Sequence, residues 1–185
     1  MIPRILAFAL TACALVVAPL TAAPQKIQVD HAASKVGFVA KATMHSFEGW
    51  IETWDLELSV PEGADLPDVV VFKGNGATMT TDHTKRDAEM HHWMEHDKLP
   101  DVEFRLTRFS GTATARVAEG DLILHGVTVP ISFPITMTRE GAKLTVTGDV
   151  VVDTAKFGLP QFRKFGMLSV ATEVKVSFSV TGKLE

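Results

Sequence analysis

Residues 170–180 read VATEVKVSFSV, in which every second residue is apolar or Thr. Alternation with a period of two over this length is typical of a long antiparallel strand with one face in water and one face in an apolar interior. The same pattern recurs in residues 129–137 and 144–152. Strands of this kind must close their apolar faces on one another. Because little helix is available to cover them, the sequence predicts an all-β barrel or sandwich.

Further short alternating segments fill most of the chain. The expected strands cover residues 26–30, 34–42, 50–60, 69–79, 102–106, 112–117, 121–125, 127–138, 142–153 and 170–183, with a hairpin turn at Glu119-Gly120. Pro130 and Pro134 fall on the solvent-facing side of the strand over 127–138. Because proline has no N–H to donate, we expect an exposed edge or a bulge at these positions.

One helix is expected, over residues 84–96. Thr84 and Asp87 have the spacing of a capping box, with Asp in place of Glu. Met90, Trp93 and Met94 form a narrow apolar stripe on one face of this helix. We expect that stripe to pack on one end of the barrel and to contact whatever the barrel holds.

The N-terminus has the layout of a secretory signal. Arg4 supplies a positive start, residues 5–17 form an apolar run, and small residues follow up to Ala23. The run is short for a membrane span, so we expect a cleaved signal peptide over residues 1–23, with cleavage near Ala22 or Ala23, followed by one domain over 24–185. The alternative is a lipoprotein, because residues 10–13 read LTAC and resemble a lipobox ending at Cys13.

Composition restricts the stabilising bonds and the partners. Cys13 is the only cysteine, so the domain over 24–185 has no disulfide and depends on burial and hydrogen bonds. That domain has 22 acidic and 17 basic residues, a formal net charge of −5. This acidic balance argues against nucleic acid and against anionic membrane as partners.

The apolar positions of the strands and helix predict the walls of a barrel interior. A packed core is the ordinary filling of an eight-stranded barrel. Here the strands are long and many inward positions are only Val, Ala, Thr or Gly, which favours a cavity for an apolar chain. Such a chain gains roughly 0.8 kcal/mol per buried methylene without polar contacts. The candidate ligand-binding residues are Phe38, Trp54, Leu56, Met90, Trp93, Phe104, Leu106, Leu124, Phe133, Ile135, Val146, Val150, Val174, Val176 and Phe178.

The histidines of the expected helix offer a different hypothesis. Glu89, His92 and His96 fall on one helical face, and such a face can bind Zn²⁺ or Cu²⁺. The alternative function is therefore a metal-binding protein or a metal-dependent enzyme. The same residues also suit the solvated face of an amphipathic helix, which is the interpretation we favour. Arg86, in the first turn, suits an ion pair or a cap, which is the interpretation we favour. The alternative is contact with a ligand headgroup or a carboxylate at the barrel rim.

Six short segments, in this order and spacing, resemble a known family. They are SKVGF at 34–38, FEGW at 47–50, RDAEMH at 86–91, KLPDVEF at 98–104, LILHGVT at 122–128 and KFGL at 156–159. Together they resemble the YceI-like polyisoprenoid-binding family of bacterial periplasmic proteins, over nearly the whole domain. The chain departs from the common family pattern at residues 153–158, where Thr154, Ala155 and Lys156 replace residues that are often Arg or Asp.

The resemblance implies an extended, lipocalin-like antiparallel barrel of about eight strands with one short helix. Its interior would hold an isoprenoid, an isoprenoid quinone or a fatty-acyl chain. It also implies a periplasmic binding protein rather than an enzyme, with no catalytic residue and no cofactor other than the bound lipid. Members of that family are often dimeric, and some are encoded with or fused to membrane cytochromes. A homodimer and a functional link to membrane cytochromes are therefore further expectations.

Overall fold

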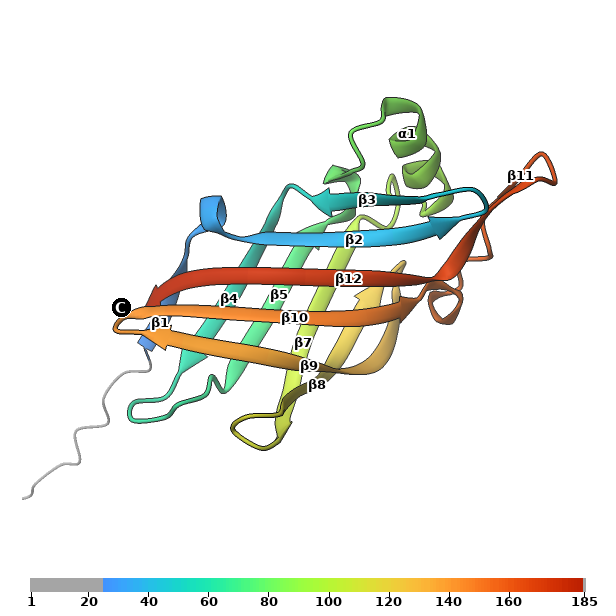
Figure 1. Ribbon diagram of the computed structural model, residues 1–185. Coiled ribbons are helices and arrows are strands. Elements are labelled where there is room, and N and C mark those ends of the chain that lie inside the picture. Colours follow the sequence, from blue (N-terminus) through green and yellow to red (C-terminus); the bar gives the residue numbers. More distant parts are fainter. Residues whose placement is uncertain (1–24, 185) are drawn as a thin grey trace, which may run out of the picture.

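A closed antiparallel barrel forms the body of the protein. The computed structural model describes residues 25–184; the expected signal peptide and the lipobox cysteine lie outside this range. The barrel strands are β1 (Gln25–Val29), β4 (Trp54–Val60), β5 (Val69–Asn75), β7 (Asp101–Gly111), β8 (Arg116–Leu124), β9 (Val127–Glu140), β10 (Lys143–Asp153) and β12 (Leu168–Leu184). They pair in that order, and β1 pairs again with β12, which closes the ring (Figure 1). The predicted barrel is confirmed.

Three positions in the barrel wall, here called staves, are each formed by two strands in line with a short interruption between them. The turn η1 (His31–Ala33) separates β1 from β2 (Lys35–Ala42), and both strands pair with β12. In the same way β3 (Ser46–Ile51) precedes β4, and η2 (Gly76–Thr78) separates β5 from β6 (Met79–Thr80). The strands β2, β3 and β6 therefore extend the wall toward one end of the barrel.

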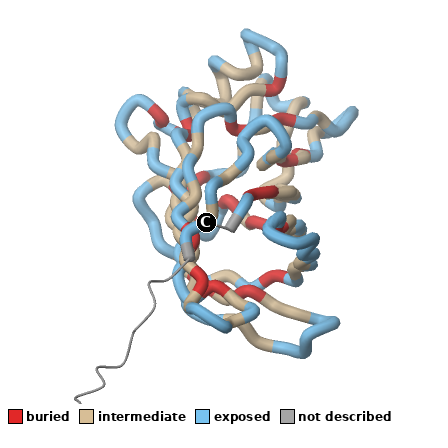
Figure 2. The backbone as a smooth tube through the Cα atoms, turned by 90° about the vertical axis from the view of Figure 1, so that its left-hand side faces the viewer, coloured by how far each residue is buried: buried red, intermediate tan, exposed pale blue. Residues whose placement is uncertain are grey.

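The extended end is covered by α1 (Thr84–Trp93) and by the segment from η3 (Thr154–Phe157) through β11 (Arg163–Lys164). Figure 1 shows α1 above this end, with the β11 hairpin projecting beyond it. Figure 2 views the barrel from the opposite end, where the C-terminus lies, and shows buried residues distributed around the wall. Among the described residues, no helix has both the length and the apolar character needed to span a membrane.

Some boundaries differ from the sequence predictions. The helix ends at Trp93 rather than His96, because Glu95 adopts a left-handed conformation (φ 52°) that a continuing helix does not allow. His83, not Thr84, is the N-cap, and its Nδ1 accepts from the Arg86 N–H at 3.3 Å. The capping box is therefore wrong, although Asp87 does bond back to the chain before the helix.

The predicted turn at Glu119-Gly120 is also wrong. Both residues lie inside β8, which is continuous, and the chain reverses at residues 111–115 instead. Gly120 serves packing at this position, since a Cβ there would lie 2.7 Å from the Phe104 ring. The strand expected over 102–106 continues to Gly111 as β7, and the strand expected from residue 112 begins at Arg116. Strand breaks also lie at residues 52–53 and 76–78, within or beside segments that alternation alone presents as uninterrupted.

An interruption of the hydrogen-bonded pairing between β9 and β10 explains why β9 can contain two prolines. The register between β9 and β10 ends at Ile135 and Gly148, so Pro130 and Pro134 lie where β9 pairs with β8 but not with β10. The expected exposed edge is confirmed. Phe157 and Leu159, each 1% exposed, belong to a core cluster that packs against Met90 and Trp93 of α1.

Candidate ligand-binding cavity

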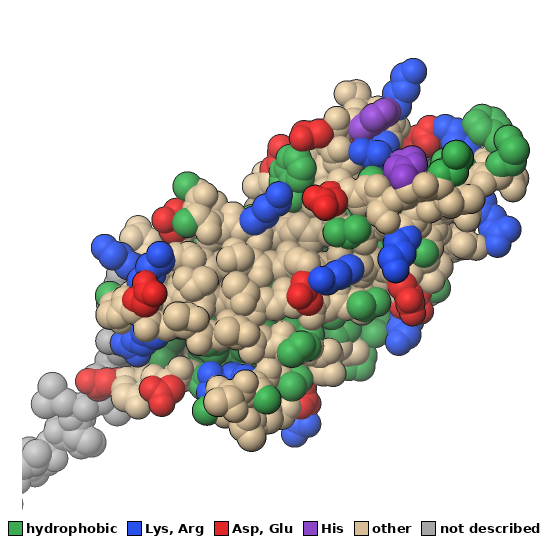
Figure 3. Space-filling model, in the orientation of Figure 1, with side chains coloured by type: hydrophobic (Ala, Val, Ile, Leu, Met, Phe, Trp, Pro, Cys, Tyr) green, Lys and Arg blue, Asp and Glu red, His purple; other side chains and the backbone are tan. Residues whose placement is uncertain are grey.

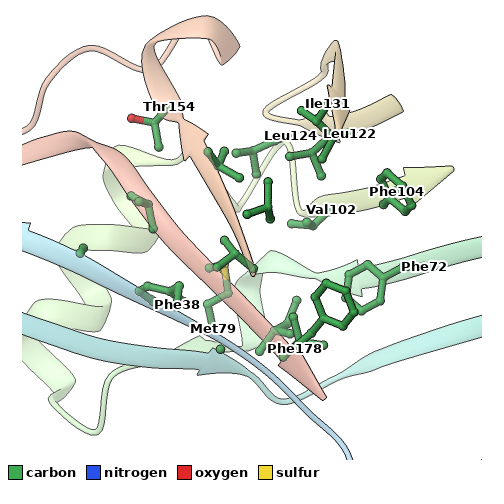
Figure 4. Close-up of a pocket in the computed structure, with 18 of the residues that line it drawn as sticks. Phe38, Phe72, Met79, Val102, Phe104, Leu122, Leu124, Ile131, Thr154 and Phe178 are labelled. Atoms are coloured by element: carbon green, nitrogen blue, oxygen red, sulfur yellow. The ribbon is translucent and has the colours of Figure 1, made fainter. Parts of the chain in front are cut away.

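The barrel interior is hollow. It contains a cavity of about 660 Å³ lined by inward side chains of the barrel strands, together with β2, β3, β6 and α1. In Figure 4 labelled side chains from several strands, among them Phe38, Phe104 and Phe178, converge on this space. The cavity runs from residues beside α1 to Ile27 and Gly182 near the opposite end.

Phenylalanine rings lie against the wall because glycines face them from neighbouring positions. A Cβ at Gly49 would meet the Phe38 ring at 2.3 Å, and a Cβ at Gly148 would meet the Phe178 ring at 2.6 Å. Phe38 pairs with Gly49 across β2 and β3, and Phe178 pairs with Gly148 across β12 and β10. The absent side chains leave room for the rings at the wall, so the centre of the barrel stays open.

The structure places fourteen of the fifteen candidate residues on the cavity surface. These are Phe38, Leu56, Met90, Trp93, Phe104, Leu106, Leu124, Phe133, Ile135, Val146, Val150, Val174, Val176 and Phe178. That they contact a ligand stays a prediction.

Trp54 is the exception and is corrected here. It is the first residue of β4, next to the break after β3, and its ring lies 4.6 Å from that of His31 and 5.8 Å from that of Phe72. The interruption of the neighbouring stave at η1 provides His31 as a partner, so Trp54 packs there rather than on the cavity surface.

The charged lining side chains gather at the α1 end. They are Lys85, Arg86 and Glu89 of α1 and Lys164 of β11, with His45 and His83 beside them. Charged groups stay in contact with water unless they are paired, so we regard this end as the mouth of the cavity. The remaining lining is apolar apart from Thr154, which donates to the Thr172 carbonyl at 3.1 Å.

Arg86 is held at the mouth by neutral partners. Its Nε donates to Thr81 Oγ1 at 2.7 Å, its Nη2 donates to the Thr81 carbonyl at 2.9 Å, and its guanidinium lies 4.7 Å from the Phe47 ring centre. No carboxylate among the described residues forms an ion pair with it. The ion pair that the sequence favoured is thus not formed, and the positive charge of Arg86 remains available to the cavity. Contact with a ligand headgroup stays a prediction.

Asp87 fixes the start of α1 against β6. Its carboxylate accepts from the Thr81 N–H at 2.9 Å, from Thr81 Oγ1 at 2.5 Å and from Thr80 Oγ1 at 2.9 Å. Burial alone would raise the pKa of this carboxyl, but the hydrogen bonds from Thr81 and Thr80 outweigh it and hold the pKa below its usual value. The ionised form of Asp87 thus anchors the helix that covers the mouth.

The alternative metal site is not assembled. Glu89 forms an ion pair with Lys164, His92 is exposed, and His96 lies beyond the end of the helix, buried at 3% exposure. Across residues 25–184 no group of three His, Cys, Asp or Glu side chains is arranged to hold a metal ion. The expectation that His96 continues the helical face is wrong, because the chain turns at Glu95.

His96 instead forms a buried pair with His91. Their ring centres are 5.3 Å apart, and His91 Nε2 lies 2.7 Å from the Met79 carbonyl. Within the described part of the chain neither ring nitrogen of His96 has a hydrogen-bond partner. Burial, and then the nearby His91, lower the pKa of His96 to about 4, so this side chain is neutral at pH 7.

Several lining residues were not among the sequence candidates. Phe72 of β5 and Met79 of β6 line the cavity, and the alternation of residues 70–74 could have identified Phe72. Phe162 and Lys164 also line it, but they come from an irregular segment without periodicity. His125, which the sequence analysis did not single out, has one ring nitrogen 3.1 Å from the Phe157 carbonyl and the other 3.2 Å from Glu95 Oε2.

The architecture defines a class of protein: a single eight-stranded barrel with an internal apolar cavity and a charged mouth. The YceI-like domain family matches residues 27–182, and the chain therefore belongs to that family.

Relatives and solved structures agree with this placement. A UPF0312 protein of Pseudomonas savastanoi pv. phaseolicola is 32% identical over 112 residues, which cover 58% of this chain and 56% of the relative. That of Pseudomonas fluorescens is 28% identical over 114 residues, with the same shares. The chain thus matches just over half the length of these curated relatives.

Two solved structures share the fold. Burkholderia cenocepacia BcnA superposes with a TM-score of 0.73 at 18% identity, over 83% of this chain and 99% of that chain. A domain from Saccharophagus degradans, described as a polyisoprenoid binding domain implicated in plant cell wall breakdown, gives a TM-score of 0.66 at 15% identity, over 87% and 98% of the two chains.

Proposed function

We propose that the protein binds a long apolar lipid inside the barrel, as a carrier or store and not as a catalyst. The observation that carries the proposal is the cavity of about 660 Å³ with an almost wholly apolar lining. The volume lies within the range of about 300–1,000 Å³ typical of small-molecule sites. The polyisoprenoid binding domain with the same fold supports an isoprenoid, an isoprenoid quinone or a fatty-acyl chain as the class of ligand.

The cavity volume sets the size of the expected ligand. A methylene group takes a volume similar to that of a water molecule in the liquid, ~30 Å³. A cavity of 660 Å³ therefore accommodates on the order of 20 chain carbons. At roughly 0.8 kcal/mol per methylene, the gross gain from burial exceeds about 10 kcal/mol. Part of this gain is offset by the lost freedom of the chain, which leaves enough for tight binding without a polar contact.

The charged mouth orients an amphipathic lipid. A hydrocarbon tail would enter the apolar interior, while a polar headgroup would remain near Arg86, Lys85 and the Glu89–Lys164 pair. We further propose a periplasmic location, supported by the signal-like N-terminus. A homodimer and a link to membrane cytochromes stay predictions based on the family.

The test is extraction of lipid from protein purified under native conditions, followed by mass spectrometry. We expect one long-chain species in stoichiometric amount. A matched preparation of the Val146→Phe variant, in which a ring fills part of the lumen, should carry less of that species, whereas Val151→Phe on the outer face of β10 should match the parent protein. Repeated recovery of empty protein that takes up neither a prenyl nor an acyl probe would refute the proposal.

A further inference from the structure

Three large apolar side chains at the mouth end of the barrel, beside α1, project into solvent. Met44 is 88% exposed, Phe165 is 85% exposed and Met167 is 81% exposed. Among the described residues these are the most exposed of the large hydrophobic side chains. Figure 3 shows hydrophobic side chains at the tip of the β11–β12 hairpin, with Lys, Arg and His side chains and some Asp or Glu side chains over the same end of the molecule.

The three side chains belong to one structural unit. Met44 lies in the turn between β2 and β3, and the other two lie in the β11–β12 hairpin. Hydrogen bonds join the two loops: the Thr43 N–H donates to the Ser169 carbonyl at 3.0 Å, and the two hydroxyls lie 3.1 Å apart. We call Met44, Phe165 and Met167 the apolar tip. It adjoins the mouth, because His45 and Lys164 of the same loops line the cavity.

The backbone at Phe165 gives a second indication that the tip has a role. Phe165 and Gly166 both have positive φ, 52° and 70°, and the Met167 N–H donates to the Lys164 carbonyl at 3.3 Å. A turn with two positive φ angles favours Asn or Asp followed by Gly, and a bulky residue is unfavourable there. The Phe165 ring is exposed and has Lys164 Nζ 5.4 Å from its centre. Neither backbone preference nor burial therefore accounts for Phe at this position, and an exposed cation–π contact contributes only about 0.5–1 kcal/mol.

The charge around the apolar tip is positive although the domain is acidic. Apart from Glu48, which follows at the end of the first loop, residues 41–47 and 161–168 contain Lys41, Arg163 and Lys164, together with His45, and no Asp or Glu. Lys164 forms an ion pair with Glu89 of α1, so the unpaired positive charge of these loops comes from Lys41 and Arg163, for which the described residues provide no ion pair. Net charge therefore misrepresents this end of the molecule, because what a surface attracts depends on its local charge. Identical cationic tips would repel one another, which disfavours a second copy of this chain as the partner.

We propose that the apolar tip docks the barrel onto a lipid bilayer containing anionic phospholipids. Met44, Phe165 and Met167 enter the interfacial region, while Lys41 and Arg163 lie among the headgroups. In this orientation the mouth of the cavity faces the bilayer, so an apolar chain passes between membrane and barrel without crossing water. The docking goes beyond the proposed lipid binding and does not require that the cavity ligand be identified.

The test uses flotation of the purified protein with vesicles of phosphatidylcholine and phosphatidylglycerol at about 7:3. Phe165→Asn is the decisive single variant, because Asn suits the positive φ and should keep or raise the melting temperature. Met44→Ser, Phe165→Asn and Met167→Ser are also combined. Val151→Ser is the matched control, since Val151 is a 62% exposed apolar residue of β10 away from both loops.

We expect the partition coefficient of the triple variant to fall at least about tenfold, with a smaller fall for Phe165→Asn and none for Val151→Ser. Raised salt and pure phosphatidylcholine should weaken binding of the parent protein. The proposal is overturned if the parent protein does not float with either vesicle, or if the triple variant floats equally well. It is also overturned if light scattering shows a dimer that the triple variant dissociates, because a second copy then covers the tip. Uptake of a soluble acyl probe should be equal in all variants, which separates a failure of docking from a failure of lipid binding.

Discussion

The substitution Val146→Phe should shorten the longest lipid that the barrel can hold. Val146 lies on the inner face of β10, where it pairs with Val180 of β12, and both residues line the cavity away from α1. The phenyl ring can enter empty space, so we expect the free energy of unfolding to change by less than about 1.5 kcal/mol. The lumen should lose room at the end opposite the mouth.

The loss of affinity follows from the number of carbons displaced. Replacing Val by Phe adds about four heavy atoms, which displace about four methylene groups of a ligand that fills the cavity. At roughly 0.8 kcal/mol each, the cost is about 3 kcal/mol, or on the order of a hundredfold in Kd. A ligand shorter by four or more carbons should bind as tightly as before.

The assay is competition of a fluorescent fatty acid by acyl chains of graded length. For Val146→Phe the plot of Kd against length should break at a shorter chain, and Val151→Phe on the outer face of the same strand should reproduce the parent curve. If Val146→Phe leaves all lengths unchanged, or weakens short and long chains equally, the ligand does not lie along this lumen and the reasoning is wrong.

Three further predictions concern stability. Phe157→Ala should lower the free energy of unfolding by about 3–5 kcal/mol in urea titration, because Phe157 is 1% exposed in the core cluster; a loss below about 1 kcal/mol would contradict this packing. Asp87→Asn should cost about 1.5–3 kcal/mol, because charge-assisted bonds to Thr80 and Thr81 are lost, and an unchanged melting temperature would count against the anchoring of α1. For His96 the pKa falls from 6.5 to about 4 on folding, so between these values the unfolded chain binds more protons and stability rises with pH. Stability at pH 4 should thus be lower than at pH 7 by up to about 3 kcal/mol, and His96→Asn should flatten this slope. The stabilisation by ionised Asp87 is present above its usual pKa of 3.8 and is lost only as the pH falls below that value. A pH profile that is the same with and without His96 would disprove the assignment.

Alternation in the sequence was sufficient to predict the inner face of the barrel. Odd and even positions of a strand face opposite sides of the sheet, and this is a local property of the strand. A shift by one residue would turn every side chain to the wrong face, so the apolar positions identify the inner face. Residues such as Phe133, Val146 and Phe178 were therefore placed correctly before any partner strand was known. The two prolines of β9 also predicted an unpaired strand edge from local information alone, because the missing N–H is a property of the residue itself.

Where alternation was interrupted, only the tertiary structure decided the outcome. Trp54 has the inward parity but packs on His31, because a break in the neighbouring stave brings that ring beside it. The helix stops before His96 because the chain turns at Glu95, and this separates the three alternative metal ligands. The packing of Trp54 depends on a contact with a segment distant in sequence, and the end of the helix depends on the backbone conformation at Glu95. The periodicity of the sequence records neither.

The sequence alone determined the all-β class, the inward faces of the long alternating strands and the family. The tertiary structure decided that the interior is a cavity, that its charged residues meet at one end, and that Met44, Phe165 and Met167 stand together beside it. The physical reason is that periodicity depends on the geometry of one strand. A cavity, a mouth and a tip depend instead on how strand ends and loops from separate parts of the chain come together when the barrel closes.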